Sequence, residues 1–214
     1  MQVLQILQVV LFSISVLTLL GIGVVILARA VSTIDRRIFV VVVIPLLLAN
    51  TLTFFNGDGF FLNWRTWLIL GADLVLIIAV LLFSHGFQVY GLDAETVAKV
   101  TSEIYLQQGY SVETNVAQKR DLWGRTRDAY LLTIQKGDSK YQVWIVKRFN
   151  EVSIRTQQRR DSGILHPVVT ALQQQKVSYE FKDHAAGLLY IVLAVVLAVL
   201  SWIFFFEPRL ILVE

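Results

Sequence analysis

The chain has 214 residues, of which 56% are hydrophobic and 16% are charged, and its net charge is +3. A soluble domain of this size would carry about a quarter charged residues, so this composition and the mean hydropathy of +0.63 point to a membrane protein. The absence of cysteine excludes structural disulfides, thiolate metal sites, cysteine nucleophiles and iron–sulfur clusters held by cysteine. The small net charge does not by itself identify a partner.

Four long apolar runs predict four transmembrane helices. Each is close to the ~20 residues that a hydrocarbon core of ~30 Å requires. Pro45 is expected to kink the second run, because proline removes a backbone donor. The first run follows no basic segment and is too long for the apolar part of a signal peptide, so we interpret it as a retained span. The runs comprise residues 3–28, 38–55, 64–83 and 185–206.

Lysine and arginine predict the orientation of these spans, because cytoplasmic loops are enriched in both. The first loop holds Arg29, Arg36 and Arg37, whereas the amino-terminal tail and the loop at 56–63 carry no basic residue. The amino terminus is therefore expected outside, in what we interpret as a bacterial plasma membrane. The predicted organisation is three spans in residues 1–84, a cytoplasmic domain in 85–184, and a fourth span with a short outer tail in 185–214.

The polar block predicts an α+β domain of order α-β-β-β-α-β, inserted between membrane helices. Asp93 is suited to cap a helix at its start, and Gly109 to end it. The sequence KGDS has the composition of a tight turn between two strands. The expected elements are a helix at 93–108, strands at 110–118, 128–135 and 140–149, a polar strand or loop at 150–160, a helix at 162–175 with Pro167 in its first turn, and a short strand at 176–181.

A helix ending in Gly109 and Tyr110, then a strand, then a hairpin opened by Asp128, resembles the Mrr-like branch of the PD-(D/E)xK restriction-endonuclease fold. In that family an aspartate opens one strand and a Glu/Gln-x-Lys motif ends the next, so Lys147 matches the lysine. The resemblance implies Mg²⁺ held by acidic oxygens, with the lysine stabilising developing charge. Ile145 stands at the Glu/Gln position and cannot bind a metal, which implies a degraded active site.

The same residues have an ordinary structural interpretation. Asp128 is then a residue at a strand end, and Lys147 an exposed residue whose stem lies along the sheet. No cofactor is expected, except Mg²⁺ in a nuclease with a rearranged site.

Asp73 lies midway along the third apolar run, where an ionised carboxylate is costly unless it is paired or faces a cavity. Asn50, Thr51 and Thr53 in the antiparallel second run are expected within its reach. The acid is interpreted either as a proton, ion or partner site, or as a hydrogen bond that holds two helices together.

His85 and His184 flank the polar domain at one predicted membrane face, as ligands of a haem or metal or as interfacial polar residues. A basic surface with Trp123 and Tyr130 beside it is interpreted as a solvated cytoplasmic face, or as a site for anionic lipid or nucleic acid. Anionic lipid is the favoured ligand of the two, because the domain is tethered beside a negative surface. The basic residues are Lys119, Arg120, Arg125, Arg127, Arg155, Arg159 and Arg160.

These features predict a non-enzymatic integral membrane protein that presents a cytoplasmic interaction domain. It would serve as an accessory subunit of a membrane assembly, with a membrane protein partner or a second copy of itself. A second interpretation is a membrane-tethered, Mg²⁺-dependent nuclease built on Asp128 and Lys147. A third is a small proton or ion pathway around Asp73.

Overall fold

The computed structural model describes residues 2–55, 64–120, 126–148 and 150–206. The chain divides into two compact units, each built from separate segments. The helical unit comprises Met1–Val24, Arg37–Ser84 and Leu188–Glu214, and the sheet unit comprises Val25–Arg36 and His85–Gly187. The first loop, which the sequence assigns to a simple connection between two spans, therefore belongs to the sheet unit.

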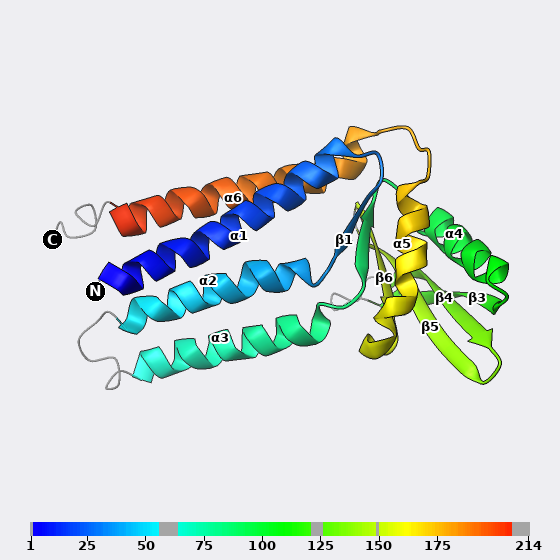
Figure 1. Cartoon of the computed structure of the whole chain (residues 1–214), viewed down its shortest axis with the longest axis horizontal. Coiled ribbons are helices and arrows are strands. Elements are labelled where there is room, and N and C mark those ends of the chain that lie inside the picture. The colour runs from blue at the N-terminus through cyan, green and yellow to red at the C-terminus, as the bar shows by residue number, and fades with distance from the viewer. Residues whose placement is uncertain (1, 56–63, 121–125, 149, 207–214) are drawn as a thin grey trace. The chain divides into compact units, whose positions relative to one another are not determined.

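Four long helices supply the helical unit (Figure 1). Among the described residues, two apolar stretches are long enough to cross a membrane, Val3–Ala28 with 26 residues and His184–Ile203 with 20. The other two stretches, Ile38–Leu52 and Leu70–Leu81, are shorter. The prediction of four spans is thus corrected to two by length and composition. The helices are α1 (Gln2–Ala28), α2 (Ile38–Phe55), α3 (Trp64–Phe83) and α6 (Phe181–Phe206).

Polar side chains link the helices of this unit. On α1, Gln8 donates through Nε2 to the carbonyl oxygen of Ala49 on α2 at 3.3 Å, and Ser15 donates through Oγ to that of Val42 at 2.8 Å. Gln8 and Ser15 are both buried. In an apolar environment such bonds between helices stabilise packing by about 0.6–2 kcal/mol each.

The sheet unit contains a six-stranded sheet of order β1-β2-β6-β5-β4-β3, in which every neighbouring pair is antiparallel. Strands β3 to β6 form a meander, and β1 and β2 extend it at the β6 edge (Figure 1). The strands are β1 (Ser32–Asp35), β2 (Phe87–Tyr90), β3 (Ser111–Arg120), β4 (Thr126–Lys136), β5 (Ser139–Arg148) and β6 (Glu151–Thr156).

One face of this sheet carries the core. Helix α4 (Ala94–Gln107) packs on β3, β4 and β5, while α5 (His166–Gln173) contacts α4 and β1. A 3₁₀ helix, η2 (Arg159–Leu165), precedes α5. The core includes fully buried Val89, Leu132 and Ile145. Since successive strand residues point to opposite faces, the alternate residues Gln88, Leu131 and Trp144 belong to the second face.

Several predicted elements are present. Helix α4 begins after Asp93, whose side chain accepts a hydrogen bond from the Thr96 amide at 2.8 Å, and this bond lowers the pKa of Asp93. Gly109 has a φ of +79° after the last turn. Strands β3, β4 and β5 and helix α5 also occur near their predicted positions. The segment at 150–160, predicted as a polar strand or loop, contains β6.

The predicted strand at 176–181 is wrong, and strands β1 and β2 were not predicted. Residues 175–180 have no strand structure, although Val177 and Tyr179 alternate with polar residues as in a strand. Both side chains are exposed, and the segment pairs with neither edge strand of the sheet. The order of the sheet unit is therefore β-β-α-β-β-β-β-α, with η2 before the last helix.

Tyr105 on α4 offers a test of how that helix is attached. Its side chain is buried, and its hydroxyl donates to the carbonyl oxygen of Ile164 in η2 at 2.5 Å. Burial, followed by the charge of Tyr110, raises the pKa of Tyr105. The neutral phenol is therefore favoured in the folded protein, and this contribution to stability is present below the unfolded-state pKa of about 10 and is lost as pH rises above it.

Tyr105→Phe is expected to lower the free energy of unfolding by about 1 kcal/mol at pH 7, because the Ile164 carbonyl loses its donor. It should also flatten the fall in stability above pH 10. Unfolding curves of the full chain in a non-ionic detergent at pH 7 and pH 10.5 measure both effects. Tyr110→Phe, which removes the hydroxyl of the ring whose centroid lies 5.6 Å away, is the control for the first effect and should resemble the parent protein at pH 7. Equal effects of the two substitutions would contradict the assignment.

Candidate functional site

The predicted nuclease pair lies at the β4–β5 ladder. Lys147 is exposed on β5, and Asp128 lies on β4 opposite Gln118 of β3, but the Asp128 side chain is outside the described residues. Ile145 is fully buried and pairs with Tyr130 in the core. Ile145, which stands where the nuclease family has a metal-binding Glu or Gln, is therefore part of the hydrophobic core. Across the described residues, no group of three His, Asp or Glu side chains could hold a metal ion.

Asp73 bridges α2 and α3. Its carboxylate is buried, with 7% of the residue exposed, and Oδ2 accepts hydrogen bonds from Asn50 Nδ2 and Thr51 Oγ1, each at 3.2 Å. Two of the three predicted partners therefore contact this acid, and the side chain of Thr53 lies outside the described residues. The arrangement is that of a polar link between two packed helices.

His184 lies in the first turn of α6, within the sheet unit, and it is fully buried. Its Nδ1 is 2.8 Å from the carbonyl oxygen of Glu180, and its Nε2 is 3.1 Å from that of Ala30. Both contacts are hydrogen bonds only when both nitrogens carry protons. The ring also stacks on Tyr179, with centroids 4.4 Å apart. Each ring nitrogen faces a backbone carbonyl oxygen in this arrangement.

The two remaining histidines have different surroundings. His85 is half-buried and interacts with a neighbouring group. His166 is exposed at the start of α5, and its ring lies edge to face with that of Phe87, with centroids 5.8 Å apart. The prediction that His85 and His184 bind a haem or metal stays untested. The contacts of the His184 ring nitrogens are with backbone carbonyl oxygens.

The predicted basic surface is described at one side chain. Arg155 is half-buried on β6. Arg125 lies outside the described residues altogether. For the rest, the backbone belongs to β3, β4 or η2 but the side chains lie outside the described part of the chain: Lys119, Arg120, Arg127, Arg159 and Arg160.

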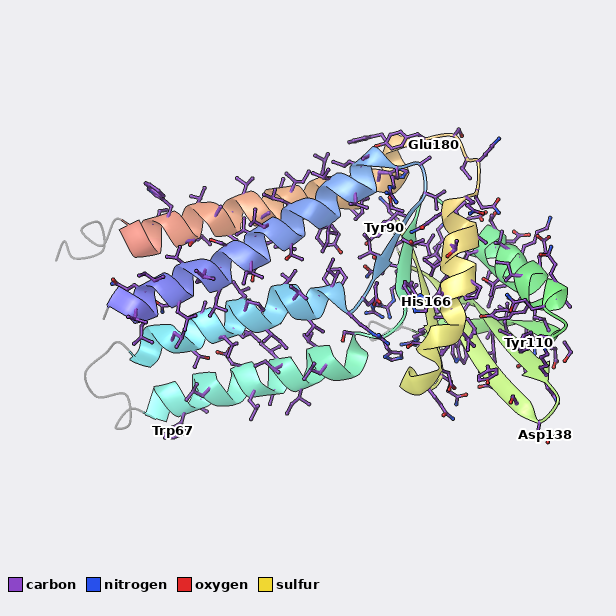
Figure 2. All side chains as sticks on the ribbon, in the orientation of Figure 1. Trp67, Tyr90, Tyr110, Asp138, His166 and Glu180 are labelled. Atoms are coloured by element: carbon purple, nitrogen blue, oxygen red, sulfur yellow. The ribbon has the colours of Figure 1, made fainter. Side chains whose placement is uncertain are left out.

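A different group of charges lies on the second face of the sheet, turned away from α4 and α5. Glu151 on β6 faces Arg148 of β5 across the ladder. The Tyr90 hydroxyl lies 3.0 Å from Oε2 of Glu151, and Gln88 Nε2 donates to its Oε1 at 3.3 Å. Tyr90 is labelled in Figure 2, and its strand β2 lies between β1 and β6 in the sheet. We call Arg36, Arg148, Arg155 and Glu151 the charged cluster.

The arginines of the charged cluster act on one another. Burial and then the positive charge of Arg148 lower the pKa of Arg36, and Glu151 partly offsets this change. Burial and Arg148 also lower the pKa of Arg155. Three guanidinium groups therefore share one partly buried region with the carboxylate of Glu151. Arginine keeps its proton in proteins, so the repulsion persists at neutral pH.

Sequence reasoning missed this group, and a usable signal was present. Arg148 and Arg155 alternate with core residues on β5 and β6, so both belong to the face that the core does not use. In the sequence, Arg36 indicates only the cytoplasmic orientation of the first loop. Its approach to the others depends on the pairing of β1 with β2, which joins segments far apart in the chain.

Comparison of the chain with protein-family models, with characterised proteins and with solved structures finds no match.

Proposed function

We propose that this chain is a non-enzymatic integral membrane protein whose helical unit anchors the sheet unit as an adaptor domain. The apolar exterior of the helical unit carries the proposal. Leu17 on α1, Val75 on α3 and Leu189 on α6 are 65–67% exposed, and α2 exposes Val41. So many exposed apolar side chains are unfavourable in water, whereas lipid tails accept them without cost.

In this proposal α2 and α3 also cross the bilayer, in addition to α1 and α6, the two helices that qualify by length and composition alone. Each of them is joined at one end to a segment of the sheet unit, since Val25–Arg36 lies between α1 and α2, and His85–Gly187 lies between α3 and α6. Four spans that alternate in direction satisfy this connectivity with the sheet unit on one side. The hydrogen bonds of Asp73 with Asn50 and Thr51 satisfy polar groups that α2 and α3 would otherwise present to lipid.

The sheet unit is cytoplasmic in this proposal, and the amino terminus is outside, in a bacterial plasma membrane. The basic residues of the first loop support that orientation. Its role is to bind a membrane protein partner as an accessory subunit, in a nuclease-like fold reused for binding. Burial of Ile145 in the core supports a binding role over catalysis.

Two experiments test the proposal, and the natural absence of cysteine makes the second direct. The chain is expected to stay in the membrane pellet after extraction with alkaline carbonate, as spanning helices do. In sealed, right-side-out vesicles, a membrane-impermeant maleimide should label Asp58→Cys in the predicted outer loop. It should label Asp138→Cys, at the tip of the β4–β5 hairpin (Figure 2), only after the vesicles are opened.

Release of the chain by carbonate would overturn the membrane anchor. Labelling of Asp138→Cys in sealed vesicles, with Asp58→Cys protected, would reverse the proposed orientation. The parent protein serves as the control, since any label it takes is not on cysteine.

A further inference from the structure

The charged cluster has more positive than negative charge. Glu151 is held by Tyr90 and Gln88, so its carboxylate has a fixed place on the second face of the sheet. It offsets one of the three arginine charges at most. Burial of these guanidinium groups, and then their mutual repulsion, lower the pKa of Arg36 and of Arg155. An additional anion between them would relieve that repulsion.

The strand register places Gly86 between two of the arginines. The amide of Arg36 donates to the carbonyl oxygen of Gly86 at 3.0 Å. On the other side, the backbone of Gly86 lies against Arg155 of β6, because a Cβ built on Gly86 would be 2.9 Å from the Arg155 Cβ. The backbones of Arg36 and Arg155 are therefore two strand spacings apart, or about 10 Å. Two arginine side chains that start this far apart can both reach one phosphate group placed between them. Gly86 adds no side chain between them.

Chain connectivity indicates the source of the anion. Arg36 precedes the first residue of α2 by two positions, and Gly86 follows the last residue of α3 by three. A chain covers at most ~3.6 Å per residue, so these positions lie within about 7 Å and 11 Å of the respective helix ends. If α2 and α3 span the bilayer, both helix ends reach the cytoplasmic interface, where lipid phosphates are concentrated.

We infer that Arg36, Arg148 and Arg155 form a binding site for the phosphate of an anionic phospholipid headgroup. This inference rests on the proposed membrane function. Arginine forks bind phosphate oxygens through paired hydrogen bonds, and a phosphodiester carries one negative charge with accepting oxygens. A headgroup without a compensating cation, such as phosphatidylglycerol, neutralises the cluster, whereas the choline of phosphatidylcholine adds a positive charge beside it.

The site is tested by titrating the full chain, purified in a non-ionic detergent, with short-chain phosphatidylglycerol, short-chain phosphatidylcholine or inorganic phosphate. Bound lipid is counted by native mass spectrometry. Arg148→Gln and Arg155→Gln are the test variants. Lys147→Gln is the matched control, because Lys147 precedes Arg148 on β5 but points to the opposite face and is exposed. All three variants lose one positive charge.

Phosphatidylglycerol is expected to bind the parent protein and Lys147→Gln equally, and to bind each arginine variant about tenfold more weakly, which corresponds to one lost charge-assisted contact. Phosphatidylcholine is expected to bind the parent protein weakly. Its affinity should be no higher than that of phosphatidylglycerol for the arginine variants. The inference is overturned if Lys147→Gln loses as much as Arg148→Gln, if both lipids bind alike, or if inorganic phosphate binds tightly while the lipid does not. Carbonate extraction separates the two proposals, since a chain that stays in the membrane but lacks the arginine effect overturns this inference alone.

Discussion

Gly86→Ala is expected to destabilise the sheet unit by more than about 3 kcal/mol. Gly86 has a φ of +91°, a backbone conformation that side chains disfavour by roughly 1–2 kcal/mol. In addition, the new Cβ would be 2.2 Å from the carbonyl oxygen of Ile154. That oxygen belongs to the β6 backbone and cannot move without breaking its ladder with β2. The strain and the clash therefore add together.

A glycine elsewhere in the same unit separates these two costs. Gly109 also has a positive φ, of +79°, yet a Cβ there would have no heavy atom within 4 Å. Gly109→Ala should therefore cost only the conformational part, about 1 kcal/mol. Amide hydrogen exchange of β2 and β6, measured by mass spectrometry on the full chain, reports the difference directly. Similar protection of these strands in the two variants would contradict the proposed clash with β6.

His184→Ala is expected to lower the stability of the sheet unit by about 2–4 kcal/mol. The substitution removes both ring nitrogens, and the carbonyl oxygens of Glu180 and Ala30 each lose a partner. A lost hydrogen bond costs about 1 kcal/mol, the stacking on Tyr179 is lost as well, and removal of the fully buried ring leaves a cavity. Because Ala30 lies two residues before the start of β1, protection from exchange should fall first in β1 and in its partner β2.

His166→Ala is the control, because His166 is exposed at the start of α5. It should change stability by less than about 1 kcal/mol, the usual range for exposed positions. Thermal unfolding followed by tryptophan fluorescence gives the magnitude, and hydrogen exchange gives the location. A neutral effect of His184→Ala would show that the two carbonyls find other donors.

Local sequence patterns predicted the parts of the fold that local interactions determine. Helix α4 is fixed by the cap at Asp93 and the glycine at 109, both of which are visible within a few residues. The hairpin of β4 and β5 is equally local, with Gly137 at its turn. Strand β1 is four residues long and gains its structure from β2, which follows two intervening helices, so no local pattern marks it.

The candidate site was predictable to a smaller degree for the same reason. The contact of Asp73 with Asn50 and Thr51 followed from the depths of two antiparallel helices. The charged cluster needed the order of the strands, because Arg36, Arg148 and Arg155 come from three of them or their ends. Among the described residues, length and composition support two of the four predicted spans.

The split origin of the sheet also bears on how the protein is made. During synthesis β1 leaves the ribosome before α2 and α3, and its partner β2 only after them. Until then β1 has no partner, and the sheet cannot close before the α2–α3 pair has been placed. A fragment restricted to residues 85–184 would lack β1 and would expose the outer edge of β2 to other chains. Biogenesis of the two units is therefore coupled by a single four-residue strand.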